Sequence, residues 1–356
     1  MIVLYVCSSE PYAGKSLVTL VLGRRYQEMG LAVGFMKPIG NMPTRVEGTT
    51  TDEDAAYIAQ TLHLKEALTD LCPVLLTPEM MHKVFTGNPP DFMEAIDRSF
   101  AVVSRDKDLV IVGGLGAVCC TGLSLGIDQR EIVQRMDAKA LLIGKYVDDR
   151  SIDMILTSKL TLQDRLLGAI LNGVARNQRD RVRDEVAPFL EKRGLPVFGV
   201  LPRDPVLSSI SVRELAEAVH ARVLCCEEHL DELVEQFTVG AMSVESALRY
   251  FARTANKAVI TGGDRADIQL AALETSTRCL ILTGDLHPHP RILTQAEEAG
   301  VPVLLTRDDT LSTVERIERV LGKLRVREPQ KIQRAMALAD ESLDLPRLDA
   351  ALGLTR

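Results

Sequence analysis

The tripeptide Gly14-Lys15-Ser16 stands between an apolar run at residues 2–6 and a helical pattern that begins at Leu17. A strand, a short loop and a helix in this order form the local context of a phosphate-binding loop. Backbone amides of such a loop and the positive end of its helix face an anion. We therefore expect one group of residues to surround the phosphates of ATP or a similar nucleotide: Ser9, Ala13, Gly14, Lys15, Ser16 and Leu17.

Two positions of this loop depart from the usual pattern. The glycine expected at its entry is absent, and Ser8 or Ser9 stands there instead. Glu10 occupies the point at which partition and septum-placement ATPases carry a second lysine that reaches across a dimer. The reversed charge disfavours a trans-lysine switch. A chance Gly-Lys-Ser at a helix start is the alternative interpretation of the motif.

Short β-branched runs alternate with helical patterns through the first 200 residues. This alternation predicts a P-loop NTPase-type α/β fold, in which a mostly parallel sheet is covered by helices on both faces. The first domain is expected over residues 1–206. The expected strands are residues 2–6, 32–36, 109–113, 139–143, 167–171 and 197–200.

A second alternating series follows a Pro- and Ser-containing linker near residues 202–211. It predicts a smaller α/β domain over residues 211–325, which has no Gly-Lys-Ser of its own. The tail over residues 326–356 is predicted to be an appendage that is helical or partly disordered.

Lys37 ends the second expected strand, at the same edge of the sheet as the loop. It is there a candidate to meet a phosphate or an anionic second substrate, or else a solvated lysine. Lys15 and Lys37 are thus the candidate catalytic residues. Ser16 and Asp54 are the candidate Mg²⁺ ligands, although Asp54 at a helix start is equally explained as a capping residue.

The third strand ends in Gly113-Gly114, where such proteins usually carry a metal-binding acid. Its absence predicts weak or altered catalysis. Asn172, at the end of another strand, is a candidate reader of a purine edge or a loop amide satisfied by the protein. Pro202 follows the last strand and is a candidate to line the base pocket.

Composition excludes several classes of partner. The formal net charge is −7, aromatic residues make up 4% and tryptophan is absent. We therefore expect neither nucleic-acid binding nor attachment to an anionic membrane. The seven scattered cysteines and the lack of a basic leader indicate reduced thiols and a cytoplasmic protein.

The order of these motifs resembles that of dethiobiotin synthetases, and more closely the N-terminal domain of long bacterial phosphotransacetylases. Thr261 through Ile268 (TGGDRADI) resemble the DRTGG module found beside such domains. The resemblance implies ATP and Mg²⁺ as ligands, with Lys37 handling a carbamate and Asp54 binding the metal. It also implies a homodimer formed through the DRTGG module. The metal-binding glutamate of dethiobiotin synthetases falls at Gly113 and is missing.

Two functions remain as hypotheses. The first is an ATP-binding regulatory protein whose nucleotide site is coupled to the DRTGG module or to a metabolic enzyme partner, in acetyl-phosphate or acetyl-CoA metabolism. The second is an ATP-dependent ligase or carboxylase acting on an unknown small substrate. If the chain is an enzyme at all, we expect at most a weak ATPase or such a ligase. A loop that no longer binds nucleotide is the third interpretation.

Overall fold

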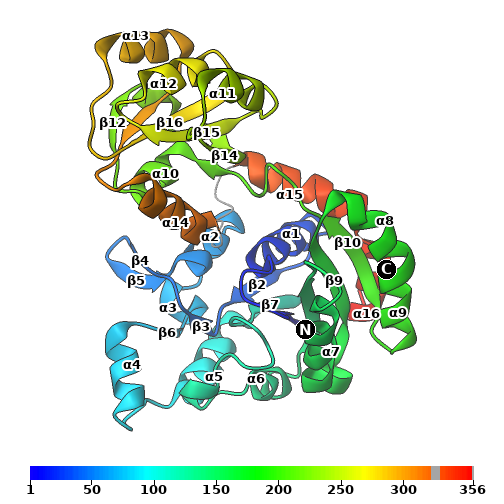
Figure 1. Ribbon diagram of the computed structural model, residues 1–356. Coiled ribbons are helices and arrows are strands. Elements are labelled where there is room, and N and C mark those ends of the chain that lie inside the picture. The colour runs from blue at the N-terminus through cyan, green and yellow to red at the C-terminus, as the bar shows by residue number, and fades with distance from the viewer. Residues whose placement is uncertain (322–328, 355–356) are drawn as a thin grey trace. The chain divides into compact units, whose positions relative to one another are not determined.

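The computed structural model describes residues 1–321 and 329–354, which fall into two compact units (Figure 1). The first unit contains Met1–Arg203 and the described C-terminal helices. The second begins at Asp204 and contains the described residues up to Leu321. The second unit is therefore an insertion in the sequence of the first.

A parallel six-stranded sheet forms the centre of the first unit, in the order β10-β9-β8-β1-β7-β2. Successive residues of β1 are buried from Val3 to Ser8, so both faces of the sheet are covered. The predicted fold class is confirmed. The strands are β1 (Ile2–Ser8), β2 (Val33–Met36), β7 (Leu109–Gly113), β8 (Lys139–Lys145), β9 (Leu166–Val174) and β10 (Val197–Pro202).

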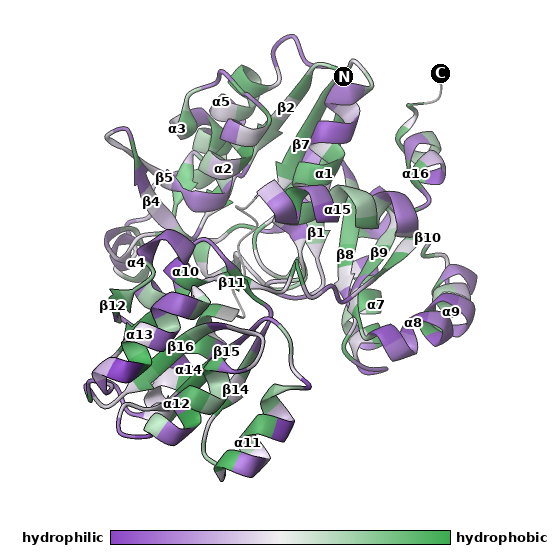
Figure 2. Cartoon of the chain, turned by 90° about the horizontal axis from the view of Figure 1, so that it is seen from above, coloured by the Kyte–Doolittle hydropathy of each residue, from purple (hydrophilic) through white to green (hydrophobic). Residues whose placement is uncertain are grey.

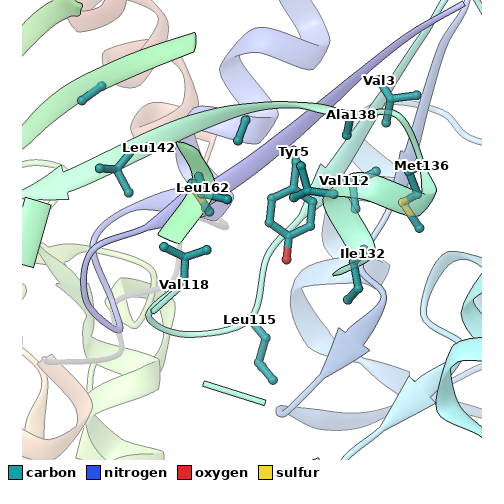
Figure 3. Close-up of a cluster of buried hydrophobic side chains, with 14 of the residues drawn as sticks. Val3, Tyr5, Val112, Leu115, Val118, Ile132, Met136, Ala138, Leu142 and Leu162 are labelled. Carbon is teal, nitrogen blue, oxygen red and sulfur yellow. The ribbon is translucent and has the colours of Figure 1, made fainter. Parts of the chain in front are cut away.

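Val3, Tyr5 and Val112 belong to a buried cluster that continues through Leu142 (Figure 3). Hydropathy colouring shows the same division, with apolar strands inside and helices that turn polar residues outward (Figure 2). The helices that connect these strands are α1 (Lys15–Glu28), α2 (Glu53–Thr61), α6 (Gln129–Arg135), α7 (Ser151–Leu162), α8 (Arg179–Arg181) and α9 (Ala187–Lys192).

A further group of short elements between β2 and β7 has no counterpart in the sequence prediction. Two hairpin strands, β4 and β5, pair antiparallel there. The elements are β3 (Ile39–Gly40), β4 (Pro43–Val46), β5 (Thr49–Asp52), α3 (Leu68–Leu71), β6 (Val74–Leu75), α4 (Pro78–Phe85) and α5 (Phe92–Val103).

The C-terminal segment was expected to be an appendage that is helical or partly disordered. Its described residues form two helices, α15 (Pro329–Ser342) and α16 (Leu345–Leu352), which belong to the first unit. Helix α15 packs on α1 and β10. The Asp349 carboxylate accepts hydrogen bonds from Tyr26 Oη at 3.0 Å and Arg25 Nη2 at 2.8 Å. These buried polar contacts explain why the segment returns to the sheet.

The second unit contains a five-stranded sheet in the order β12-β17-β16-β15-β14, in which only the β12–β17 pair is antiparallel. Its strands are β12 (Arg222–Cys225), β14 (Gln236–Val239), β15 (Lys257–Gly262), β16 (Thr277–Thr283) and β17 (Val303–Leu305). Its helices are α10 (Val212–Ala218), α11 (Val244–Phe251), α12 (Ala266–Leu273), α13 (Pro290–Ala299) and α14 (Thr310–Leu321). Among the described residues of both units, no helix is long and apolar enough to cross a membrane.

Candidate nucleotide site

The loop between β1 and α1 has the backbone that a phosphate cradle requires. Gly14 caps α1 with φ of 96°, in the left-handed region that favours glycine. A Cβ atom at Gly14 would collide with the side-chain amide of Asn172. The first α-helical hydrogen bond here runs from Val18 N to Gly14 O, so the preceding amides at the start of α1 are available to an anion.

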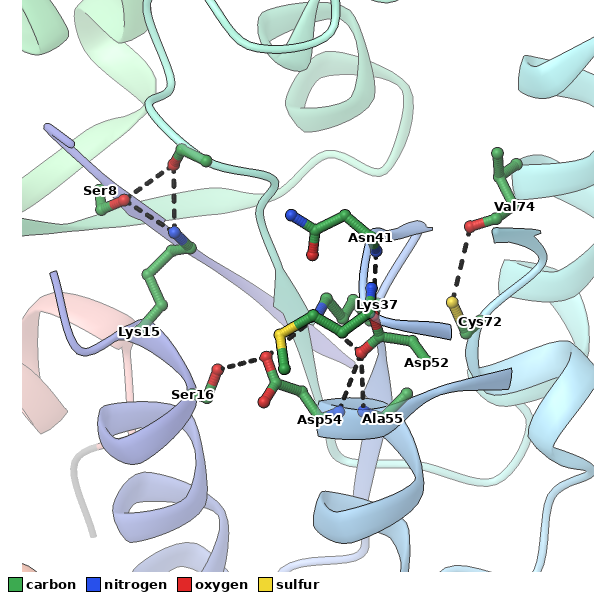
Figure 4. Close-up of polar contacts among 12 residues, drawn as sticks. Ser8, Lys15, Ser16, Lys37, Asn41, Asp52, Asp54, Ala55, Cys72 and Val74 are labelled. Carbon is green, nitrogen blue, oxygen red and sulfur yellow. Dashed lines mark hydrogen bonds and ion pairs between the residues drawn. The ribbon is translucent and has the colours of Figure 1, made fainter. Parts of the chain in front are cut away.

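The Lys15 ammonium lies over this loop (Figure 4). It donates to Ser8 Oγ at 2.8 Å and to the carbonyl oxygen of Gly116 at 3.1 Å. Burial lowers the pKa of Lys15 to about 8. Both partners are neutral oxygens, so an anion that enters the loop would interact more favourably with this ammonium than they do.

A chain of polar contacts joins the loop to the end of β2. Ser16 donates to Asp54 Oδ2 at 2.9 Å, and Lys37 Nζ lies 3.0 Å from the same oxygen (Figure 4). Lys37 is buried, and its ammonium also lies 2.6 Å from Asp52 Oδ1. The structure thus brings together the Ser16, Lys37 and Asp54 side chains that the sequence singled out.

Asp52 holds this cluster in place. Its fully buried carboxylate caps α2 through the amides of Asp54 and Ala55, and it also accepts from the amides of Asn41 and Met42. Burial lowers the pKa of Lys37, but the two aspartates more than offset burial and raise that pKa above its ordinary value. Lys37 is therefore a fixed cation at neutral pH.

Asp54 keeps its negative charge for a related reason. Burial raises the pKa of its carboxyl, but the Lys37 ammonium and the Ser16 hydroxyl outweigh burial and bring that pKa below its usual range. A serine hydroxyl beside a carboxylate supplies the hard oxygen ligands that Mg²⁺ prefers. No group of three or more His, Cys, Asp or Glu side chains in the described residues is arranged to hold a metal. A magnesium ion here would take its remaining ligands from phosphate and water.

The strand β7 ends without an acid, as the sequence indicated. Gly113 pairs with Val6 of β1, and a Cβ atom there would meet Phe35 at an ordinary 3.6 Å. Packing therefore leaves room for a Cβ atom at Gly113. Gly114 differs, because a Cβ atom there would lie 3.0 Å from Tyr5, whose hydroxyl donates to buried Gln129.

The two candidates for base recognition lie on adjacent strands. Asn172 on β9 donates from Nδ2 to the carbonyl oxygen of Ala13 at 2.8 Å and accepts from Gly173 N. In this geometry the Asn172 side-chain amide stabilises the loop between β1 and α1. Pro202 ends β10 beside Val174. Base reading by Asn172 and Pro202 stays a prediction, as do phosphate contacts by Ser9 and Leu17.

Two side chains of the site have contacts that the sequence did not indicate. Ser8 contacts the ammonium of Lys15 and the carbonyl groups of Glu10 and Gly116. Gln129 donates to the carbonyl groups of Leu115, Ala117 and Thr121, and so shapes the loop after β7. A single sequence gives no pattern for contacts with backbone carbonyl groups, or for contacts between residues more than a hundred positions apart. Gln129 is the first residue of α6, directly after the N-cap Asp128, and this position does not indicate its contacts with the loop.

The parallel sheet and the lysine-bearing loop after β1 define the class of P-loop α/β proteins. The chain belongs to the AAA domain family, whose model matches residues 3–211. The model of the DRTGG domain matches residues 214–320. The DRTGG module predicted from the sequence is confirmed.

Two curated relatives share the name phosphate acetyltransferase. Residues of this chain are 26% identical to phosphate acetyltransferase of Synechocystis sp., over 96% of this chain and 50% of the relative. Identity to phosphate acetyltransferase of Nitratidesulfovibrio vulgaris is 24%, over 98% of this chain and 51% of the relative. The predicted resemblance to phosphotransacetylases is confirmed. The chain spans about half the length of these relatives.

Solved structures give weaker likenesses. The CBS and DRTGG domains of the regulatory region of Clostridium perfringens pyrophosphatase, complexed with the activator diadenosine tetraphosphate, match with a TM-score of 0.29 and 18% identity. That match covers 44% of this chain and 77% of the other. The MinC:MinD complex of Aquifex aeolicus matches with a TM-score of 0.33 and 14% identity, over 58% of this chain and 84% of the other. Scores this low say nothing about function.

Proposed function

We propose that the chain is an ATP-binding regulatory protein, in which the loop after β1 binds nucleotide and the DRTGG domain responds to it. One observation carries the proposal: the DRTGG unit is inserted between two elements that belong to the nucleotide-binding unit. A domain attached in this way has two covalent connections to its host. Nucleotide-dependent changes at either connection would bias its conformation.

The first connection follows the edge strand of the sheet. Strand β10 ends at Pro202, and Arg203 N then donates to the carbonyl oxygen of Val174 on β9. Asp204, the first residue of the DRTGG unit, follows immediately. The chain therefore enters the second unit from the end of β10, beside the strand that supplies Asn172 to the loop.

The second connection enters α15, which packs on α1. Helix α1 carries Lys15 and Ser16 at its first turn, and its Arg25 and Tyr26 bind Asp349 of α16. An isolated bridge between Gly199 and Leu343 joins the same C-terminal segment to β10. The helix that presents the phosphate loop is thus held by the segment that returns from the DRTGG unit.

The end of β7 supports binding in preference to turnover. Gly113 offers no metal-binding carboxylate, although a Cβ atom would fit there. Binding without rapid hydrolysis suits a sensor, because the bound nucleotide then persists long enough to change a second domain. Mg²⁺ held through Ser16 and Asp54 belongs to the proposal.

The curated relatives suggest the metabolic setting. All the named relatives above are phosphate acetyltransferases, and this chain matches about half of each. We propose that the chain acts in acetyl-phosphate or acetyl-CoA metabolism, as a cytoplasmic homodimer that regulates an acetyl-transferring activity. The acetyl-transfer activity itself is not assigned to the part of the protein described here.

Titration calorimetry with ATP and Mg²⁺, on the wild type and on Lys15→Ala, tests binding. Hydrogen exchange on the full chain, with and without ATP, then tests coupling. We expect slower exchange in the loop and at the start of α1, together with a change in the DRTGG unit. A wild type without affinity for ATP would refute the proposal. Protection confined to the first unit would refute the coupling.

A ligase or carboxylase is the second candidate, because buried Lys37 lies in the same cluster as Ser16 and Asp54. A lysine in that place could hold an anionic substrate beside the phosphates. ADP release that is strongly stimulated by a candidate acid or amine would favour this function. Slow basal hydrolysis without stimulation would favour the regulatory one.

A further inference from the structure

The phosphate loop contains an acid of its own. Glu10 is the second residue after β1, and its side chain is 34% exposed. The Glu10 carbonyl oxygen lies 2.7 Å from Ser8 Oγ, which in turn accepts from the Lys15 ammonium. A carboxylate in a loop that receives phosphate repels it, by an amount that depends on how well the charge is screened.

Lys145 is placed to screen that carboxylate. It ends β8, the strand that pairs with β1, and its backbone N–H donates to Ser9 Oγ at 3.1 Å. Its ammonium lies 3.9 Å from Glu10 Oε2. The main chain of Lys145 is therefore anchored at the loop entry while its side chain reaches the acid one residue further on.

The neighbouring strand β9 contacts the other end of the same loop. Lys145 pairs with Asn172 of β9 in the ladder, and Asn172 donates to the carbonyl oxygen of Ala13. Adjacent strands thus hold the loop near Ser9 and near Gly14. This anchoring fixes the main chain of Lys145 at the point from which its side chain reaches Glu10.

We propose that Lys145 is a positioning residue that holds the Glu10 carboxylate away from the bound phosphates. The inference rests on the proposed nucleotide binding and assigns to Lys145 an effect exerted through Glu10. Direct contact between Lys145 and phosphate is the competing arrangement. The two differ in one respect: removing Glu10 abolishes the need for Lys145 only if Lys145 acts through it.

Calorimetry with ATP and Mg²⁺ distinguishes an effect through Glu10 from direct contact between Lys145 and phosphate. It uses four full-length proteins: the wild type, Lys145→Ala, Glu10→Gln and the double variant. We expect Lys145→Ala to weaken binding about three- to fivefold, the scale of a partly exposed ion pair. Glu10→Gln should bind at least as tightly as the wild type. The double variant should return to within about 1.5-fold of the wild type.

Lys192→Ala is the matched control, because it removes an equal charge from an exposed position on α9 and should leave affinity unchanged. Thermal unfolding of each variant checks that the loop variants are folded. Loss of affinity that persists in the double variant, or Lys145→Ala binding like the wild type, would overturn the inference. A wild type that binds no ATP would instead overturn the proposed function.

Discussion

Replacement of Asp52 by alanine should strongly destabilise the first unit. The fully buried carboxylate accepts from the Lys37 ammonium and from four backbone amides, two of which belong to the first turn of α2. Asp54 would still pair with the Lys37 ammonium, but four backbone amides would lose their acceptor. Together with the weakened ion pair, these losses place the cost at about 3 to 5 kcal/mol, of which the helix cap contributes about 1 kcal/mol. For a unit of this size, we expect a fall in Tm of roughly 6 to 20 °C.

Asp91 provides the matched control. It is also an aspartate that caps a helix, but it is exposed, and within the described part of the chain its carboxylate accepts only from Glu94 N, at 2.9 Å. Asp91→Ala should therefore cost about 1 kcal/mol, the price of a cap alone. Asp52→Asn separates the two contributions, because asparagine caps well but leaves Lys37 without that charge.

Urea unfolding followed by tyrosine fluorescence measures these differences. Five of the six tyrosines precede residue 204, so the signal reports chiefly on the first unit, and tryptophan is absent. We expect Asp52→Ala to be less stable than Asp91→Ala by at least about 2 kcal/mol, with Asp52→Asn between them. Equal stability of the two alanine variants would show that the buried pair contributes no more than a cap.

Three further outcomes follow from particular side chains. Because burial lowers the pKa of Lys15 to about 8 in the free protein, about half of the Lys15 side chains are neutral near pH 8, and ATP binding there should take up about half a proton. Calorimetry in buffers of different ionisation enthalpy detects this proton uptake, and Lys15→Ala should abolish it. Gly14→Ala should abolish ATP binding, since its Cβ would meet Asn172, whereas Gly173→Ala, with a similar φ of 78° but open space, should retain it in the same titration. Burial also lowers the pKa of Lys257 from 10.5 to about 8, so the unfolded chain binds more protons than the folded chain between these pH values. The second unit should therefore gain stability as pH rises from about 8 to 10.5, and the denaturant midpoint of Lys257→Met should lack that rise.

Most of the central sheet was predictable, because each of its strands is a short apolar run next to a helical pattern. Gly14-Lys15-Ser16 fixed the position of the loop, and the carboxyl ends of parallel strands brought Lys37 to the same edge. Asp52 was predictable as a helix-start residue from its place before α2. The five hydrogen bonds that its carboxylate accepts were not predictable, since three of the donors lie 10 to 15 residues earlier in the chain.

The hairpin of β4 and β5 escaped prediction because its residues alternate weakly and include Pro43. The return of α15 and α16 to the first unit escaped it for a different reason. A local pattern identifies a helix but not the surface that it packs on. The Asp349 contacts with α1 span over 320 residues of sequence.

The partners of the three lysines around the loop set an order of importance that the variants can test. Lys37 is held by two aspartates and Lys145 lies beside Glu10, whereas Lys15 has only neutral hydrogen-bond partners among the described residues. A lysine ammonium that is already paired with a carboxylate gains less interaction energy from a bound phosphate than one whose partners are neutral oxygens. Lys15→Ala should therefore lose more ATP affinity than Lys145→Ala. The reverse order would place the charge that binds phosphate at the entry of the loop and not at the start of α1.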